Sequence, residues 1–191
     1  MEILTDIHPK WLKWLSPDSF NDEELFRIIT FFVFHSPCSD LSSMSKTLSE
    51  YGWSAPWQKP YYLNKQLKQL SSNYELLFSA CRYDKMDTEL EKANLKDNFP
   101  SDLSHERICF VNNKSNQFLS VFYHIRNAFA HCRLSIIEVD GECVFVFEDV
   151  QFNRNADKLK VSARMILRKS TLLNWIDLIE SGEREYKKSL T

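Results

Sequence analysis

The stretch that decides the fold is NQFLSVFYHIRNAFAHCRL, residues 116–134. Its apolar residues recur at steps of three and four, which is the spacing of one face of an α-helix. The residues in this pattern are Phe118, Val121, Phe122, Ile125 and Phe129. We predict a core helix that begins near residues 113–115 and ends near His131.

The end of this predicted helix carries polar side chains where the apolar pattern would otherwise continue. Asn127 and His131 lie four positions apart and share a helical face, and Arg126 lies one position round from Asn127. Arginine is always charged and is rarely buried without a partner. The three side chains therefore form a candidate catalytic site. Because the helix dipole alone also favours Arg and His near a helix C-terminus, the spacing by itself leaves a structural role open.

Downstream of the helix, the period of the sequence changes to that of strands. Residues 134–139 and 143–147 flank Asp140-Gly141, a dipeptide typical of a type I′ turn, and predict a β-hairpin. Strict alternation of apolar residues over 159–167 predicts a third strand. A final helix is expected to start at Ser170 or Thr171 and to stop at Gly182.

Upstream, the pattern is mainly helical. An N-cap at Asn21 or Asp22 precedes a stretch that is apolar nearly all round and predicts a buried helix ending before Ser36. The other expected elements are a short helix at 11–15, a weak helix at 41–48, a loop at 51–60, a helix at 61–81 and a polar connection at 82–104 with a short helix near 87–95. We therefore predict a mainly α protein: one domain over residues 1–191, built as a helical bundle with a small antiparallel sheet inserted before its C-terminal helix.

The composition excludes several classes of protein. The chain has 191 residues, of which 43% are hydrophobic, so it has enough apolar material for a packed core. Its three glycines are scattered and cannot build a glycine-rich phosphate loop. A net charge of -2 argues against a protein that coats nucleic acid, but it is compatible with an enzyme that contacts a few phosphates.

The cysteines and the hydropathy indicate a cytoplasmic protein that does not contact a membrane. The five cysteines are odd in number and lack C-x-x-C spacing, which is typical of free thiols in a reducing compartment. The first ten residues lack the profile of a signal peptide, and the longest apolar stretch, residues 28–34, is too short to cross a bilayer.

Residues 107–134 (RICFVNNKSNQFLSVFYHIRNAFAHCRL) resemble the HEPN superfamily of helical-bundle ribonucleases and toxins. The superfamily signature is an Arg, a polar residue, a few apolar residues and a His at the end of a core helix. Arg126, Asn127, the apolar residues 128–130 and His131 match it in order and spacing. Together with the hairpin, strand and last helix that follow, the chain is similar to a small plasmid- and phage-defence-associated HEPN family over about half of its length.

Two positions depart from the superfamily pattern. Cys132 follows the motif His where such sequences often have Gly, which would alter how the chain leaves the helix. Arg133 stands where some HEPN toxins carry a Tyr that a partner nucleotidyltransferase modifies, so control by that route is not expected.

The resemblance implies a metal-independent endoribonuclease that cleaves RNA through attack of the 2′-OH, as a toxin or antiphage effector. His131 would transfer a proton, because histidine titrates close to physiological pH. Arg126 would bind phosphate oxygens, and Asn127 would orient the imidazole or the phosphate. The resemblance also implies a homodimer in which two motifs face one cleft, and it leaves room for an antitoxin or other defence protein as a partner. No cofactor and no metal are expected.

Two other interpretations stay open: a HEPN-like module that binds RNA, a nucleotide or a protein without cleavage, and a structural helical adaptor. His124 lies two turns from His131, too far for both to bind one metal ion, and we expect it to form a polar wall of the cleft or to lie at the surface. The pairs His105-Glu106 and Glu148-Asp149 show no convergent partners in the sequence.

Overall fold

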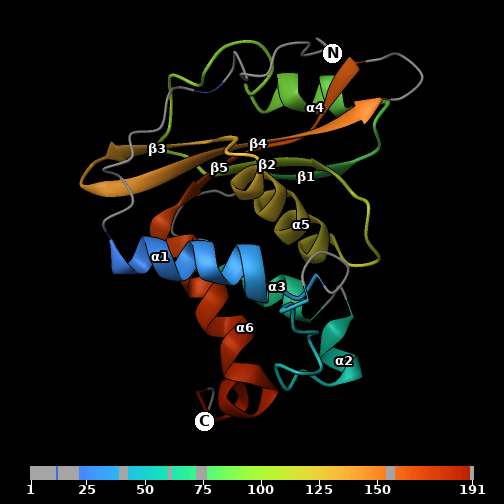
Figure 1. Cartoon of the computed structure of the whole chain (residues 1–191), viewed down its shortest axis with the longest axis vertical. Coiled ribbons are helices and arrows are strands. Elements are labelled where there is room, and N and C mark those ends of the chain that lie inside the picture. The colour runs from blue at the N-terminus through green and yellow to red at the C-terminus, as the bar shows by residue number, and fades with distance from the viewer. Residues whose placement is uncertain are drawn as a thin grey trace.

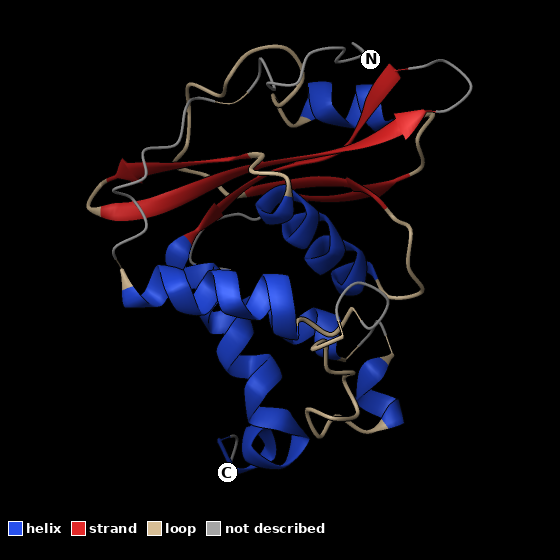
Figure 2. Ribbon diagram, viewed as in Figure 1, coloured by secondary structure: helices blue, strands red, loops and turns tan. Residues whose placement is uncertain are grey.

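A mixed β-sheet lies at the centre of the molecule, with helices on both of its faces (Figures 1 and 2). The structure is a computed structural model and describes residues 12, 22–38, 43–59, 62–71, 77–153 and 158–189. Within these ranges the sheet has five strands in the order β1-β2-β5-β4-β3. They are β1 (Leu77–Cys81), β2 (Arg107–Val111), β3 (Leu134–Val139), β4 (Glu142–Asn153) and β5 (Lys158–Arg168).

The prediction of a mainly α bundle with a small inserted sheet is wrong, because the fold is mixed α/β with the sheet in the middle. The sequence analysis missed β1, which falls within the segment predicted to continue as a helix to residue 81, and β2. Both are short apolar runs, in which periodicity does not distinguish a strand from a buried helix. Their pairing decides their structure: β1 and β2 are parallel, and β2 is antiparallel to β5, far along the chain.

The strands that follow the core helix are confirmed. β3 and β4 form the predicted hairpin, and Asp140 and Gly141 have φ values of 53° and 79°, the left-handed backbone that a type I′ turn requires. β5 covers the predicted third strand. β4 continues well beyond the predicted end at residue 147, and this extension carries residues of the candidate site described below.

The helices agree with the prediction in part. They are α1 (Glu23–Thr30), the π-helical turn η2 (Phe31–His35), α2 (Ala55–Gln58), α3 (Leu63–Leu70), α4 (Met86–Lys92), α5 (Gln117–Ala130) and α6 (Lys169–Ser189). Asp22 caps α1 by accepting a hydrogen bond from the Glu24 N–H (2.8 Å). Residues 43–48 form turns and irregular backbone instead of the expected weak helix, and the expected loop at 51–60 contains α2. The helix expected at 11–15 lies outside the described residues apart from Leu12.

The last helix is confirmed to lose its helical backbone at Gly182, where φ is 67°, although helical turns resume and continue to Ser189. A Cβ atom at this glycine would lie 2.5 Å from the carbonyl oxygen of Tyr51. Glycine is therefore required here both by the backbone and by the close approach of residues 51–52.

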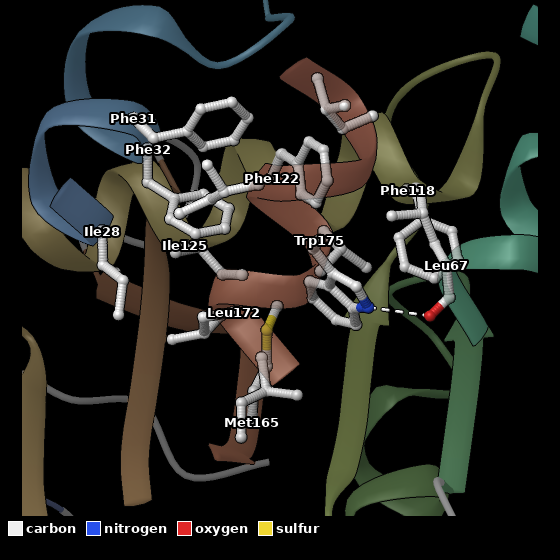
Figure 3. Packing of buried hydrophobic residues seen from close by; sticks show 14 of the residues in the cluster. Ile28, Phe31, Phe32, Leu67, Phe118, Phe122, Ile125, Met165, Leu172 and Trp175 are labelled. Atoms are coloured by element: carbon white, nitrogen blue, oxygen red, sulfur yellow. Dashed lines mark hydrogen bonds between the residues drawn. The ribbon is translucent and has the colours of Figure 1, made fainter. Parts of the chain in front are cut away.

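The sheet separates two hydrophobic clusters among the described residues. On one face, Phe118 and Phe122 of α5 pack against Trp175 of α6, with ring centroids 5.2 and 6.1 Å apart (Figure 3). The Trp175 indole N–H donates to the carbonyl oxygen of Leu67 (2.8 Å), which joins α6 to α3. On the other face, α4 covers a smaller cluster that includes Met86, Leu90, Cys109, Val144 and Val146. Alternate residues of β4 thus enter different clusters, and α5 packs on one face of the sheet.

Candidate active site

The helix α5 is held at its N-terminus by its cap and along its length by the sheet. The Asn116 side chain accepts hydrogen bonds from the N–H groups of Phe118 (2.9 Å) and Leu119 (3.4 Å), which sets the first turn a few residues later than predicted. The inward face of α5 is buried. Its outward stripe, which includes Tyr123 and Arg126, stays partly exposed.

The C-terminus of α5 ends at His131, as predicted. His131 is the C-cap, and the chain leaves the helix through hydrogen bonds from the Arg133 N–H to the Ala128 carbonyl (2.7 Å) and from the Cys132 N–H to the Phe129 carbonyl (3.1 Å). These two bonds form a Schellman motif, whose left-handed position favours Gly. Cys132 occupies this position with a φ of 53°, which explains why related sequences often have Gly there.

Two of the three predicted site residues are in direct contact. The Arg126 guanidinium, which is half-buried, donates from Nη1 to the Asn127 Oδ1 (3.2 Å). The Asn127 side chain is buried, and its Nδ2 lies 3.5 Å from Oδ2 of Asp149, a residue that the sequence analysis had set aside. The hydrogen bond between Arg126 and Asn127 holds the guanidinium group beside the amide group.

The third predicted residue, His131, is joined to Asn127 only through the backbone, where its N–H donates to the Asn127 carbonyl (2.9 Å). Its imidazole is exposed at the end of the helix and makes no hydrogen bond within the described part of the chain. It is therefore free to meet a ligand or another protein molecule.

The expectation for His124 is wrong, since this residue of α5 is fully buried. Its Nδ1 lies 2.6 Å from Asp149 Oδ2, and its Nε2 lies 2.9 Å from the carbonyl oxygen of Val111 at the end of β2. Buried polar groups need such partners because an unsatisfied one is costly away from water. His124 is therefore a core residue that joins α5 to two strands.

Asp149 also has the convergent partners that the sequence analysis did not find. Besides His124 and Asn127, its Oδ2 accepts a hydrogen bond from Ser162 Oγ (2.9 Å). The strand register shifts at this point: Asp149 pairs with Ala163 and Val150 with Val161, so Ser162 is an extra residue in β5. A β-bulge re-aims side chains, and here it directs the Ser162 hydroxyl to the carboxylate. The available signal was an acidic pair, Glu148-Asp149, directly after the apolar run at 143–147.

Glu148, the neighbour of Asp149, is paired on the other face of the sheet. Its carboxylate binds Arg133 (3.3 Å) and Arg164 (3.0 Å). Arg164 also donates to the carbonyl oxygens of Leu95 (2.7 Å) and Lys96. Burial raises the pKa of Glu148, and the two guanidinium groups oppose this rise. Arg133, which stands at the position of the modified Tyr in some toxins, is thus a buried ion-pair residue.

Glu106 also has hydrogen-bond partners, which lie at the junction of β5 and α6. It accepts hydrogen bonds from the Arg168 N–H (2.8 Å) and the Thr171 hydroxyl (3.0 Å), and burial raises its pKa to about 7. His105 is exposed, and its Nδ1 lies 3.2 Å from Asp102 Oδ2. The contacts of both residues within the described part of the chain lie outside the motif on α5.

Two lysine side chains lie over tyrosine rings, one of them on α5. Lys114 Nζ lies 5.3 Å from the ring centroid of Tyr123, which precedes Arg126 and Asn127 by one helical turn. Lys160 Nζ lies 4.8 Å from the ring centroid of Tyr83. Burial, together with the negative charge of Asp149, raises the pKa of Tyr83 to about 12, so this phenol stays protonated.

Two searches of the described residues gave negative results. No group of three or more His, Cys, Asp or Glu side chains in the ranges given above is arranged to hold a metal ion. None of the described helices combines the length and the apolar character needed to cross a membrane.

A sheet-bound helix that ends in Arg-Asn, apolar residues and His defines this protein as a HEPN-type domain. The chain belongs to the HEPN pEK499 p136 family, whose family model matches residues 43–184. This range includes every strand of the sheet and the whole of α5, so the resemblance inferred from residues 107–134 is confirmed. No curated protein and no solved structure matches the chain.

Proposed function

We propose that this protein is a metal-independent endoribonuclease that acts as a toxin or antiphage effector. The observation that carries the proposal is the position of the family motif. Arg126 is partly exposed on α5 and contacts Asn127, and His131 is exposed at the end of the same helix. Membership of a HEPN family adds support, because HEPN domains are commonly ribonucleases of defence systems.

The proposed reaction is an internal transfer at a phosphodiester of RNA. His131 accepts the proton of the 2′-OH while the 2′-oxygen forms a bond to phosphorus and the bond from phosphorus to the 5′-oxygen breaks. The leaving 5′-oxygen gains a proton, so the products are a 2′,3′-cyclic phosphate and a 5′-hydroxyl. Arg126 binds the phosphate oxygens, where two parallel N–H donors stabilise the added negative charge.

The reaction needs a base and an acid, and one motif contains a single His. We therefore propose a homodimer with two-fold symmetry, in which the same histidine of a second protomer protonates the leaving oxygen. The exposed position of His131 at the end of α5 supports this arrangement. The cations Lys114 and Lys160, which lie over tyrosine rings, would bind backbone phosphates of the RNA.

The proposed setting is the cytoplasm, where free thiols such as those of the five cysteines stay reduced. A toxin must be restrained, and we propose that an antitoxin or another defence protein does this by binding. Arg133 has no hydroxyl and is buried against Glu148, so modification at that position is not part of the proposal.

The test is to incubate the purified protein with total RNA in the presence of EDTA, beside two histidine variants. We expect the wild type to produce fragments with 5′-hydroxyl and cyclic phosphate ends, and His131→Ala to produce none. His105→Ala is the matched control, because His105 is also exposed but lies outside the motif, and it should cleave like the wild type. A substrate with 2′-deoxy sugars should resist cleavage.

Products with 5′-phosphate ends, or activity only with added Mg²⁺, would exclude this mechanism. Binding of RNA without cleavage, unaffected by His131→Ala, would instead establish the module as non-catalytic. The absence of any RNA binding would point to a structural adaptor.

A further inference from the structure

A continuous series of hydrogen bonds connects the protein core to the candidate phosphate-binding group. It runs from the carbonyl oxygen of Val111 to His124, then to Asp149, then to Asn127 and finally to Arg126. Val111 and Asp149 belong to strands of the sheet, and His124, Asn127 and Arg126 belong to α5. The series therefore connects two strands of the sheet to the Arg126 guanidinium group through hydrogen bonds.

The inner part of the series is rigidly held. The side chains of His124 and Asp149 are 0% and 2% exposed, and both ring nitrogens of His124 face oxygen atoms. The 2.6 Å separation between Nδ1 and Oδ2 is as short as a charge-assisted hydrogen bond. Ser162, the bulged residue of β5, donates to the same carboxylate oxygen from the opposite strand.

The carboxylate also determines how the Asn127 amide is oriented. An amide group can be turned over, which exchanges its N–H₂ donor and its oxygen acceptor. An ionised carboxylate only accepts, so Asp149 requires the N–H₂ of Asn127 on its own side. The Asn127 oxygen then faces outward and accepts from Arg126 Nη1 (3.2 Å), a group that only donates. Each member of the series therefore determines the orientation of the next.

We propose that Asp149 is a positioning residue that orients Arg126 through Asn127, and that His124 and Ser162 hold Asp149 in place for this purpose. The proposal rests on the endoribonuclease function for its effect on catalysis, but its effect on the Arg126 side chain is independent of that function. Asp149→Asn weakens the series, because His124, Ser162 and Asn127 all contact the one oxygen Oδ2, and an amide oxygen is a weaker acceptor than a carboxylate oxygen.

The test compares Asp149→Asn with Glu106→Gln, a variant of another buried carboxyl group that contacts α6 and not the motif. Two quantities are measured: kcat for RNA cleavage, and the NMR signal of the Arg126 side-chain Nε–H in ¹⁵N-labelled protein. We expect Asp149→Asn to lower kcat about 100-fold, as a misplaced positioning group can, and to shift or broaden the Arg126 signal. Glu106→Gln should change neither, whatever its effect on the melting temperature.

A double-variant experiment separates positioning from a general loss of stability. If Asp149 acts through Asn127, then Asp149→Asn should lower kcat by less than threefold in an Asn127→Ala background, because the connection is already broken. A purely structural role predicts that the full loss appears again in that background. If Asp149→Asn does not fold, Ser162→Ala removes one donor to the same carboxylate and should shift the Arg126 signal in the same direction.

The outcomes are distinct. An unchanged Arg126 signal together with kcat within threefold of the wild type would overturn the positioning role. A wild-type protein that cleaves no RNA would refute the proposed function instead, and the Arg126 signal alone would then decide whether Asp149 orients this side chain.

Discussion

Glu106 is expected to make the stability of this protein fall with rising pH between about 4.5 and 7. Its carboxyl group is 1% exposed at the start of β2, where burial raises its pKa from 4.5 to about 7. The nearby Glu142 adds to this rise, while hydrogen bonds from Arg168 and Thr171 oppose it. The perturbation that isolates the effect is Glu106→Gln, which keeps the size and the polarity of the side chain.

The sign and magnitude follow from linkage. Between pH 4.5 and 7 the unfolded chain has released the Glu106 proton while the folded protein still holds it, so raising the pH favours unfolding. One pH unit corresponds to about 1.4 kcal/mol, so this pKa difference removes about 3 kcal/mol from the free energy of unfolding. The loss is complete above about pH 7. The Gln variant has no proton to release and should therefore be more stable than the wild type above pH 7, by up to about 3 kcal/mol, and similar to it near pH 4.5.

The assay is urea unfolding followed by circular dichroism at several pH values from 4.5 to 8, and the quantity of interest is the difference between wild type and variant. Glu142→Gln is the matched control, since Glu142 contacts Arg168 and Ser170 at the same end of α6 but has a lowered pKa. Its removal should cost stability at neutral pH instead. A difference between wild type and Glu106→Gln that does not vary with pH would refute the burial argument.

Three further predictions concern the motif and the assembly. Arg126→Lys keeps the charge but loses the planar pair of donors, so cleavage should fall about 100-fold, nearly as far as in Arg126→Ala, in initial-rate measurements. Cys132→Gly should relieve the left-handed backbone at φ 53° and raise the free energy of unfolding by about 0.5–1 kcal/mol in thermal melts, and no gain would show that the position is unstrained. Light scattering at micromolar concentration should give the mass of a dimer, and a clean monomer would count against the shared site.

Much of this protein follows from local patterns in its sequence. The helical period over residues 117–130 is long enough to identify α5, and the left-handed turn at Asp140-Gly141 identifies the hairpin. Arg126 and Asn127 are adjacent in the sequence, so the prediction of the helix already places both at its last turn. The family membership is likewise visible in the order and spacing of the motif.

Local patterns in the sequence did not predict the fold class. β1 and β2 have five residues each, too few for a period, and a strand of this length is stable only when neighbouring strands satisfy its backbone hydrogen bonds. β2 pairs with β5, more than fifty residues further along the chain. The prediction of a helical bundle was wrong because local patterns do not show that these two segments pair with other strands.

The support of the candidate site was likewise decided by tertiary structure. His124 and Asp149 are 25 residues apart in the chain, and only the packing of α5 on β4 brings them to 2.6 Å. The bulge that turns Ser162 toward them depends on the register of β4 and β5. By itself the sequence determined which polar groups the chain contains and which of them lie at the end of the core helix. The sheet decided which of these polar groups are buried and which partners they have. A polar group that is removed from water needs a hydrogen-bond partner, and the fold supplies this partner from a segment that is distant in the sequence.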